Sequence, residues 1–112
     1  MIIYFILVLL LMPAAVTADV YTEAQKASFE VLVDNHLSGS GAVIDSAGIG
    51  LAAAHTVMGR TRIEIRSRTL GRMDAQVFAV DAGHDIALIR LPKQAQAYPA
   101  LKIAAQAARV GE

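Results

Sequence analysis

Two residues, His55 and Asp85, stand where the sequence could support acid–base chemistry. His55 follows four small or apolar residues, 51–54 (LAAA), which would let a neighbouring strand and a substrate approach its imidazole ring. Asp85 opens the apolar run 86–89 (IALI), and a carboxylate beside a buried strand is costly unless hydrogen bonds satisfy it. A histidine ring N–H and backbone N–H groups are suitable donors. Composition alone does not pair the two residues.

A serine nucleophile would complete a hydrolytic site with a histidine base and a buried carboxylate that holds the base in the right tautomer. Every serine of this sequence precedes Asp85, and the five are Ser28, Ser38, Ser40, Ser46 and Ser67. The sequence therefore contains a candidate base and a candidate orienting carboxylate, but nothing after Asp85 that can act as the serine.

Short strands separated by turns must position these side chains. Residues 62–68 (RIEIRSR) alternate strictly, with Ile63 and Ile65 on one face. Residues 27–34 alternate except at Leu32, as expected of a strand buried on both sides. Further strands are expected at 42–44, 51–54, 75–80 and 86–91. Strands at this regular short spacing predict a small antiparallel barrel or sandwich.

The segments between the strands are turns and loops by composition. Ser38–Gly41 is expected to be flexible, Asp45–Gly48 has turn chemistry, and Leu70–Gly71 makes a further turn. Pro92 ends the last strand. Gln94–Arg109 is rich in Ala and Gln, and the pattern does not decide between a loop with a short strand and a short helix.

These segments resemble the first half of a trypsin-like serine protease. Residues 39–45 (GSGAVID), Gly48 and 51–57 (LAAAHTV) are similar to the family's G-S-G strand, turn glycine and L-T-A-A-H motif. Residues 85–91 (DIALIRL) are similar to the D-I-A-L-L-R-L segment around the triad aspartate. The lack of Cys, the short loops and the V-G-E at 110–112 favour the bacterial Deg/HtrA branch.

The resemblance covers about residues 27–112 and implies an all-β fold. That fold is an antiparallel trypsin-like β-barrel, the first of the two barrels of the chymotrypsin-type fold. The family's roles imply that His55 is the general base and Asp85 its orienting partner, with no metal and no organic cofactor. Ala52 stands where the family has Thr, and Thr56 stands where disulfide-bearing relatives have Cys.

The family's nucleophile lies in a G-x-S-G-G segment on the second barrel, and no such segment occurs here. Ser40 matches the glycine motif at the start of a strand and not the nucleophile. The resemblance therefore implies the N-terminal fragment of a serine endopeptidase, truncated before the nucleophile-bearing barrel and inactive alone. Its expected partners are a polypeptide substrate in the parent enzyme and the missing second barrel.

The N-terminal segment has the pattern of an export signal. Residues 1–18 hold 16 apolar residues and no charged side chain, and Val16-Thr17-Ala18 suits a signal peptidase. We therefore expect a signal peptide at 1–18, a linker at 19–26 and a bacterial periplasmic or secreted protein. An uncleaved anchor is the alternative, and only that alternative places the chain on a membrane.

Composition excludes several other classes of function. Ten basic and ten acidic side chains cancel, so no nucleic-acid partner is expected. The chain has no Cys, and its three scattered His have no metal-ligand spacing. His84 is expected in a solvated loop, His36 has no evident partner, and the arginines between Arg60 and Arg72 are expected on a solvated hairpin face. Two alternatives to a protease fragment remain: a non-catalytic secreted barrel that binds a partner, and a membrane-tethered β-domain unrelated to proteases.

Overall fold

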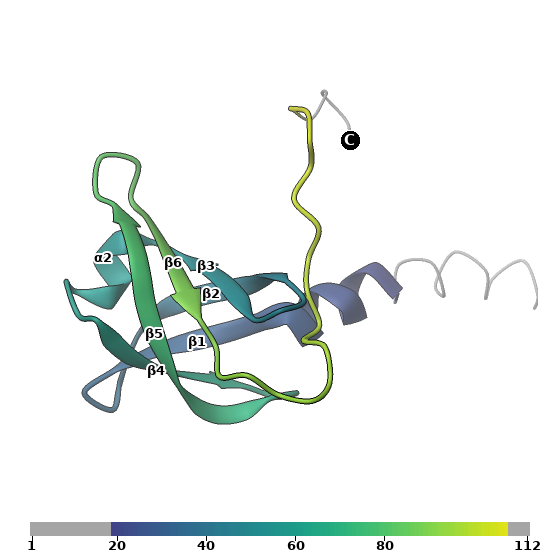
Figure 1. Cartoon of the computed structure of the whole chain (residues 1–112), viewed down its shortest axis with the longest axis horizontal. Coiled ribbons are helices and arrows are strands. Elements are labelled where there is room, and N and C mark those ends of the chain that lie inside the picture. Colours follow the sequence, from purple (N-terminus) through teal and green to yellow (C-terminus); the bar gives the residue numbers. More distant parts are fainter. Residues whose placement is uncertain (1–18, 108–112) are drawn as a thin grey trace, which may run out of the picture.

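Six antiparallel strands form a closed barrel in the computed structural model, which describes residues 19–107 (Figure 1). In chain order they are β1 (Ser28–Val33), β2 (His36–Asp45), β3 (Ile49–Ala52), β4 (Arg62–Ser67), β5 (Gly71–Asp81) and β6 (Ile86–Arg90). Around the barrel the order is β1-β2-β3-β6-β5-β4, and β4 closes against β1. The predicted all-β antiparallel barrel is confirmed.

Of the two segments predicted at the N-terminus, only the linker lies within the described residues. The expected signal peptide, residues 1–18, lies outside them. Residues 19–27 are helical and lead into β1, so the expected linker at 19–26 has regular structure. In the part of the chain from 19 to 107, no helix has the length and apolar character needed to cross a membrane.

Alternating side chains determine which face of each strand lines the interior of the barrel. Ile63 and Ile65 of β4 are buried while the neighbouring Arg62 and Arg66 are exposed, as the sequence predicted. In β1 the pairing with β2 shifts between Val31 and Leu32, which is a β-bulge. Phe29, Val31 and Val33 of β1 belong to the core cluster, whereas Leu32 is buried outside that cluster. Both faces of β1 are therefore covered, as the sequence predicted for this strand.

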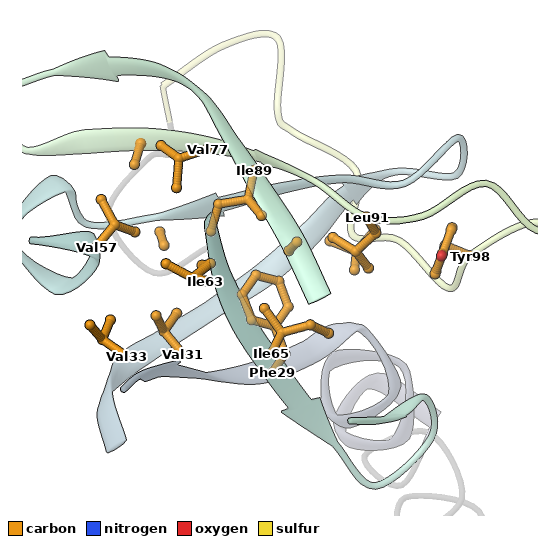
Figure 2. Close-up of a cluster of buried hydrophobic side chains, with 14 residues drawn as sticks. Phe29, Val31, Val33, Val57, Ile63, Ile65, Val77, Ile89, Leu91 and Tyr98 are labelled. Carbon is orange, nitrogen blue, oxygen red and sulfur yellow. The ribbon is translucent and has the colours of Figure 1, made fainter. Parts of the chain in front are cut away.

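The barrel is filled by one cluster of apolar side chains that come from the strands, from the helical turn after β3 and from the chain after β6 (Figure 2). Burial of each large aliphatic side chain contributes about 1.5–3 kcal/mol. The side chains labelled in Figure 2 are Phe29, Val31, Val33, Val57, Ile63, Ile65, Val77, Ile89, Leu91 and Tyr98.

The prediction of a flexible segment at the glycines of β2 is wrong. The segment Ser38–Gly41, expected to be flexible, lies inside β2. A Cβ at Gly41 would stand 2.5 Å from the carbonyl oxygen of Leu51 and 2.6 Å from the ring of Phe29. Glycine is therefore required here for close packing across the sheet, and its presence does not indicate a loose chain.

The chain after β6 packs across one end of the barrel without forming a helix or strand up to residue 107. The backbone N–H of Tyr98 donates to Ser46 at 2.9 Å, and that of Leu101 donates to Val43 at 2.8 Å. The Tyr98 ring lies beside Leu91 at the end of the core cluster (Figure 2), and its hydroxyl donates to the carbonyl of Pro92. The undecided segment is thus a loop, as far as it is described.

Candidate active site

His55 lies on a single helical turn, α2 (Ala54–Val57), directly after β3. The sequence predicted a strand before His55 but not this turn. Thr56 and Val57 are buried against the barrel, whereas the side chain of His55 is 73% exposed. The turn therefore anchors its far end in the core and presents the imidazole to solvent.

Asp85 lies at the end of the β5–β6 hairpin, immediately before β6. Its backbone has φ 56, in the left-handed region. Aspartate tolerates this conformation better than most residues, and β-branched residues tolerate it poorly. The conformation turns both the carbonyl and the carboxylate of Asp85 toward α2, as the hydrogen bonds show.

The structure joins these two residues, which stand 30 positions apart in the sequence. Asp85 Oδ2 lies 2.6 Å from His55 Nδ1, and Asp85 Oδ1 accepts the backbone N–H of His55 at 2.8 Å. The carbonyl oxygen of Asp85 also accepts the backbone N–H of Ala54 at 3.1 Å. One aspartate thus holds both the imidazole ring and the turn that carries it.

The protonation state of the pair follows from its hydrogen bonds. The backbone N–H of His55, and secondarily its ring, hold the pKa of Asp85 below its usual value. At neutral pH the carboxylate is therefore ionised and can only accept, so the proton between the two side chains sits on Nδ1 of His55. In neutral histidine this leaves Nε2 as an acceptor, and no group among residues 19–107 hydrogen-bonds to it.

A second histidine–aspartate pair lies on the same hairpin. His84 Nδ1 is 2.8 Å from Asp81 Oδ2, and the backbone N–H of His84 donates to Asp81 Oδ1 at 3.2 Å. The side chain of His84 is 79% exposed, in agreement with its expected solvated position. The sequence analysis did not anticipate this pair, although the spacing of three residues was a signal for it. Unlike the His55–Asp85 pair, it links residues of one turn only.

Within residues 19–107, no serine hydrogen-bonds to His55. Ser38 donates to the carbonyl of Thr56, Ser28 donates to the carbonyl of Ala24, and Ser67 accepts the backbone N–H of Leu70. Ser40 is exposed on β2, opposite Glu30 of β1. The resemblance implied a position at the start of a strand, whereas β2 begins four residues earlier, at His36.

The arginines between Arg60 and Arg72 lie on the outside of the barrel, as expected for a solvated face. Three of them form ion pairs with acidic side chains: Arg60 with Asp34, Arg66 with Glu30 and Arg72 with Glu64. The described part of the chain contains no group of three or more His, Asp and Glu side chains arranged to hold a metal ion.

Three comparisons with known proteins each match part of this chain. Residues 39–112 match the family model of the trypsin-like peptidase domain. The chain is 36% identical over 61 residues to the putative serine protease HhoA of Synechocystis sp., covering 54% of this chain and 16% of the relative. The apo crystal structure of the MamO protease domain from Magnetospirillum magneticum matches with a TM-score of 0.61 and 25% identity, over 73% of this chain and 46% of that chain.

The matched region contains both His55 and Asp85, and the six-stranded barrel agrees with the fold of the matched protease domain. The chain spans less than half the length of each of these relatives. The comparisons confirm the predicted resemblance to trypsin-like and HtrA-type proteases, and they remove the alternative of a β-domain unrelated to proteases. The chain belongs to the trypsin-like peptidase domain family.

Proposed function

We propose that this chain is the first barrel of an exported bacterial serine endopeptidase, in which His55 is the general base and acid and Asp85 orients it. The observation that supports the roles is the 2.6 Å contact between Asp85 Oδ2 and His55 Nδ1, with Nε2 left open to solvent. A histidine held in this way has a fixed tautomer, and its Nε2 is available to take a proton.

The proposed reaction is hydrolysis of a peptide bond by acyl transfer. A serine hydroxyl gives its proton to Nε2 of His55 as its oxygen attacks the peptide carbonyl, and Asp85 stabilises the imidazolium that forms. His55 then gives the proton to the leaving amine, and a water molecule hydrolyses the acyl-enzyme by the same route. No metal or organic cofactor takes part in this proposal.

In this proposal the serine and the oxyanion hole belong to a second barrel. Each oxyanion donor is commonly worth a factor of about 100 to 1,000 in rate, so a barrel with only the base and its partner is expected to be inactive. The first experiment is to read the coding DNA beyond the codon for Glu112. A continuing frame with a G-x-S-G-G segment supports the proposal, whereas a stop codon with no such segment nearby contradicts it.

The activity itself is tested on the product of the continuing frame. We expect it to cleave an unfolded protein substrate and to react with a fluorophosphonate probe, and we expect His55→Ala to abolish both. The 112-residue chain alone is expected not to react. Labelling of this chain that disappears with His55→Ala would show a nucleophile within it and overturn the division of the site between two barrels.

A second candidate function is binding without catalysis, as a barrel that captures a partner. The observation that favours it is the set of exposed apolar side chains on the β5–β6 hairpin, where Phe78, Val80 and Ile86 are 39%, 55% and 41% exposed. Exposed apolar side chains on one hairpin are typical of a surface that contacts a partner, here from both faces, because Val80 pairs with Ala87 and Ile86 pairs with Asp81. A soluble monomeric chain would favour the binding function, and insolubility rescued by co-expressing a second barrel would favour the protease.

A further inference from the structure

The turn that carries His55 is held from two directions. With four residues, α2 is too short to be stable by its own hydrogen bonds, so its neighbours determine its position. On the side of β6, Asp85 binds the backbone of Ala54 and His55. On the side of β2, the polar contacts converge on the next residue, Thr56.

Apart from Tyr98, Thr56 is the only buried residue among residues 19–107 whose side chain carries a polar group, and 5% of its surface is exposed. Its hydroxyl donates to the carbonyl of Ala53 at 2.7 Å, and its backbone N–H donates to the same oxygen at 3.1 Å. Its own carbonyl accepts the hydroxyl of Ser38 in β2 at 2.5 Å. These bonds tie the turn to the end of β3 and to β2.

The methyl group of Thr56 fills a hollow that exists because residue 39 is glycine. A Cβ at Gly39 would lie 2.9 Å from Cβ of Thr56 and closer still to its methyl group. Real side chains do not approach so closely, so a side chain at position 39 would have to push Thr56 outward. The α2 turn would then move with it, because Thr56 and Val57 are the buried half of that turn.

We infer that Thr56, seated against Gly39 and tethered by Ser38, is a positioning residue that sets the imidazole of His55 against the carboxylate of Asp85. The catalytic meaning of this role rests on the proposed function, but the positioned hydrogen bond is a property of this chain. His55 precedes Thr56 directly, and a displacement of about 1 Å is enough to lose a hydrogen bond, whose length range is narrow.

The test is NMR spectroscopy of the 112-residue chain, or of its complex with the second barrel if the chain alone is insoluble, read at the imidazole of His55 and the carboxyl of Asp85. Gly39→Ala removes the hollow and Ser38→Ala removes the tether. We expect both variants to lose or weaken the Nδ1 proton signal of His55. We also expect both to raise the pKa of Asp85 toward its usual value, because His55 donates the bonds that hold it down.

Ile65→Val is the matched control, because it removes one methylene from a fully buried core residue outside α2. It is expected to lower stability and leave both signals unchanged. A purely structural role for Thr56 would instead make all three variants behave alike. Adding Thr56→Ser to Gly39→Ala removes the crowded methyl group and keeps the hydroxyl, so the double variant is expected to recover part of the Nδ1 signal.

Unchanged His55 and Asp85 signals in folded Gly39→Ala and Ser38→Ala would overturn the inference. If Gly39→Ala does not fold, Ser38→Ala decides, because it removes a single hydroxyl that is only partly buried. The outcome is independent of proteolysis. A full-length product without peptidase activity would refute the proposed function. The NMR result would still decide whether Thr56 positions His55.

Discussion

Asp85 binds His55 twice through a single carboxylate, at 2.6 Å to the ring Nδ1 and at 2.8 Å to the backbone N–H. The first bond orients the imidazole and the second fixes the turn beneath it. Asp81 binds His84 in the same pattern, at 2.8 Å and 3.2 Å, but within one hairpin turn. The chain therefore contains a matched pair of histidine–aspartate contacts, and only the first joins separate parts of the fold.

If the proposed function holds, Asp85→Asn is predicted to abolish most of the activity of the proposed two-barrel peptidase while preserving the fold. Asparagine tolerates the left-handed backbone at this position, but its neutral amide no longer selects the Nδ1-protonated tautomer. We expect kcat to fall by about 10⁴-fold, as the loss of an orienting carboxylate does elsewhere. Asp81→Asn is the control and should leave kcat within about twofold, because Asp81 contacts His84 and not His55. Equal losses in both variants would refute the assignment of Asp85.

The His55–Asp85 contact is predicted to survive mild acid and to be lost in strong acid. The pKa of Asp85 is lowered by the backbone N–H of His55 and then by its ring, so the folded state binds the Asp85 proton less readily than the unfolded chain. Its contribution to stability is therefore fully present above the usual aspartate pKa of about 3.9 and is lost as pH falls through the lower folded value.

The carboxyl carbon of Asp85, followed by NMR between neutral pH and about pH 2, measures this directly. Its midpoint should lie below that of the same carbon in an unfolded reference peptide. The His55→Ala variant keeps the backbone donor and should raise the midpoint only in part. A midpoint in the wild-type chain at or above the reference value would contradict the hydrogen-bond geometry.

The strands were predictable from local patterns, because each buried face follows a period of two. Ile63 and Ile65 alternate with arginines and a glutamate, and the structure places them inside the barrel. The glycines of Ser38–Gly41 misled the analysis, because composition does not distinguish a flexible glycine from one that permits close contact. Here Gly39 faces Thr56 and Gly41 faces Phe29, and both are long-range contacts.

The candidate site was predictable in type but not in geometry. His55 and Asp85 were singled out from their neighbours, yet only the resemblance to a family paired them, because they stand 30 residues apart. The one-turn helix α2 was missed, since a four-residue element held by tertiary contacts has no periodicity to detect. The bonds of Ser38 and Thr56 were beyond sequence reasoning for the same reason.

Tyr98→Phe is predicted to destabilise the barrel by about 1 kcal/mol at neutral pH, the usual net value of one lost hydrogen bond. The lost bond is the one from the Tyr98 hydroxyl to the carbonyl of Pro92. Burial raises the pKa of Tyr98, so its contribution is present below the usual value of about 10 and is lost as pH rises through the folded pKa. Urea unfolding should therefore show wild-type stability falling in alkali by more than that of Tyr98→Phe.

Tyr21→Phe is the control for this experiment, because Tyr21 is 66% exposed on the N-terminal helical segment. Its unfolding curves should match the wild type at neutral and alkaline pH. If Tyr98→Phe and the wild type lose the same stability as the pH rises, the buried Tyr98 hydroxyl does not stabilise the end of the barrel.

Gly50→Ala is predicted to destabilise the barrel by about 1–3 kcal/mol, the usual cost of overpacking. The added Cβ would lie 2.9 Å from Cζ and 3.0 Å from Cε2 of Phe29, whereas the nearest backbone atom, the oxygen of Ala42, is 3.6 Å away. The conflict is thus with one ring. Phe29→Leu removes that ring edge, so the double variant should be more stable than the sum of the two single changes predicts.

The control for this coupling is Gly71→Ala, measured by the same urea unfolding. A Cβ at Gly71 meets no atom within 4 Å, and its positive φ of 72 makes the substitution costly through backbone strain alone. Combined with Phe29→Leu, it should therefore be additive within about 0.5 kcal/mol. Additivity for Gly50→Ala as well would mean that the Phe29 ring does not determine the glycine at position 50, and that strand geometry in β3 is the cause instead.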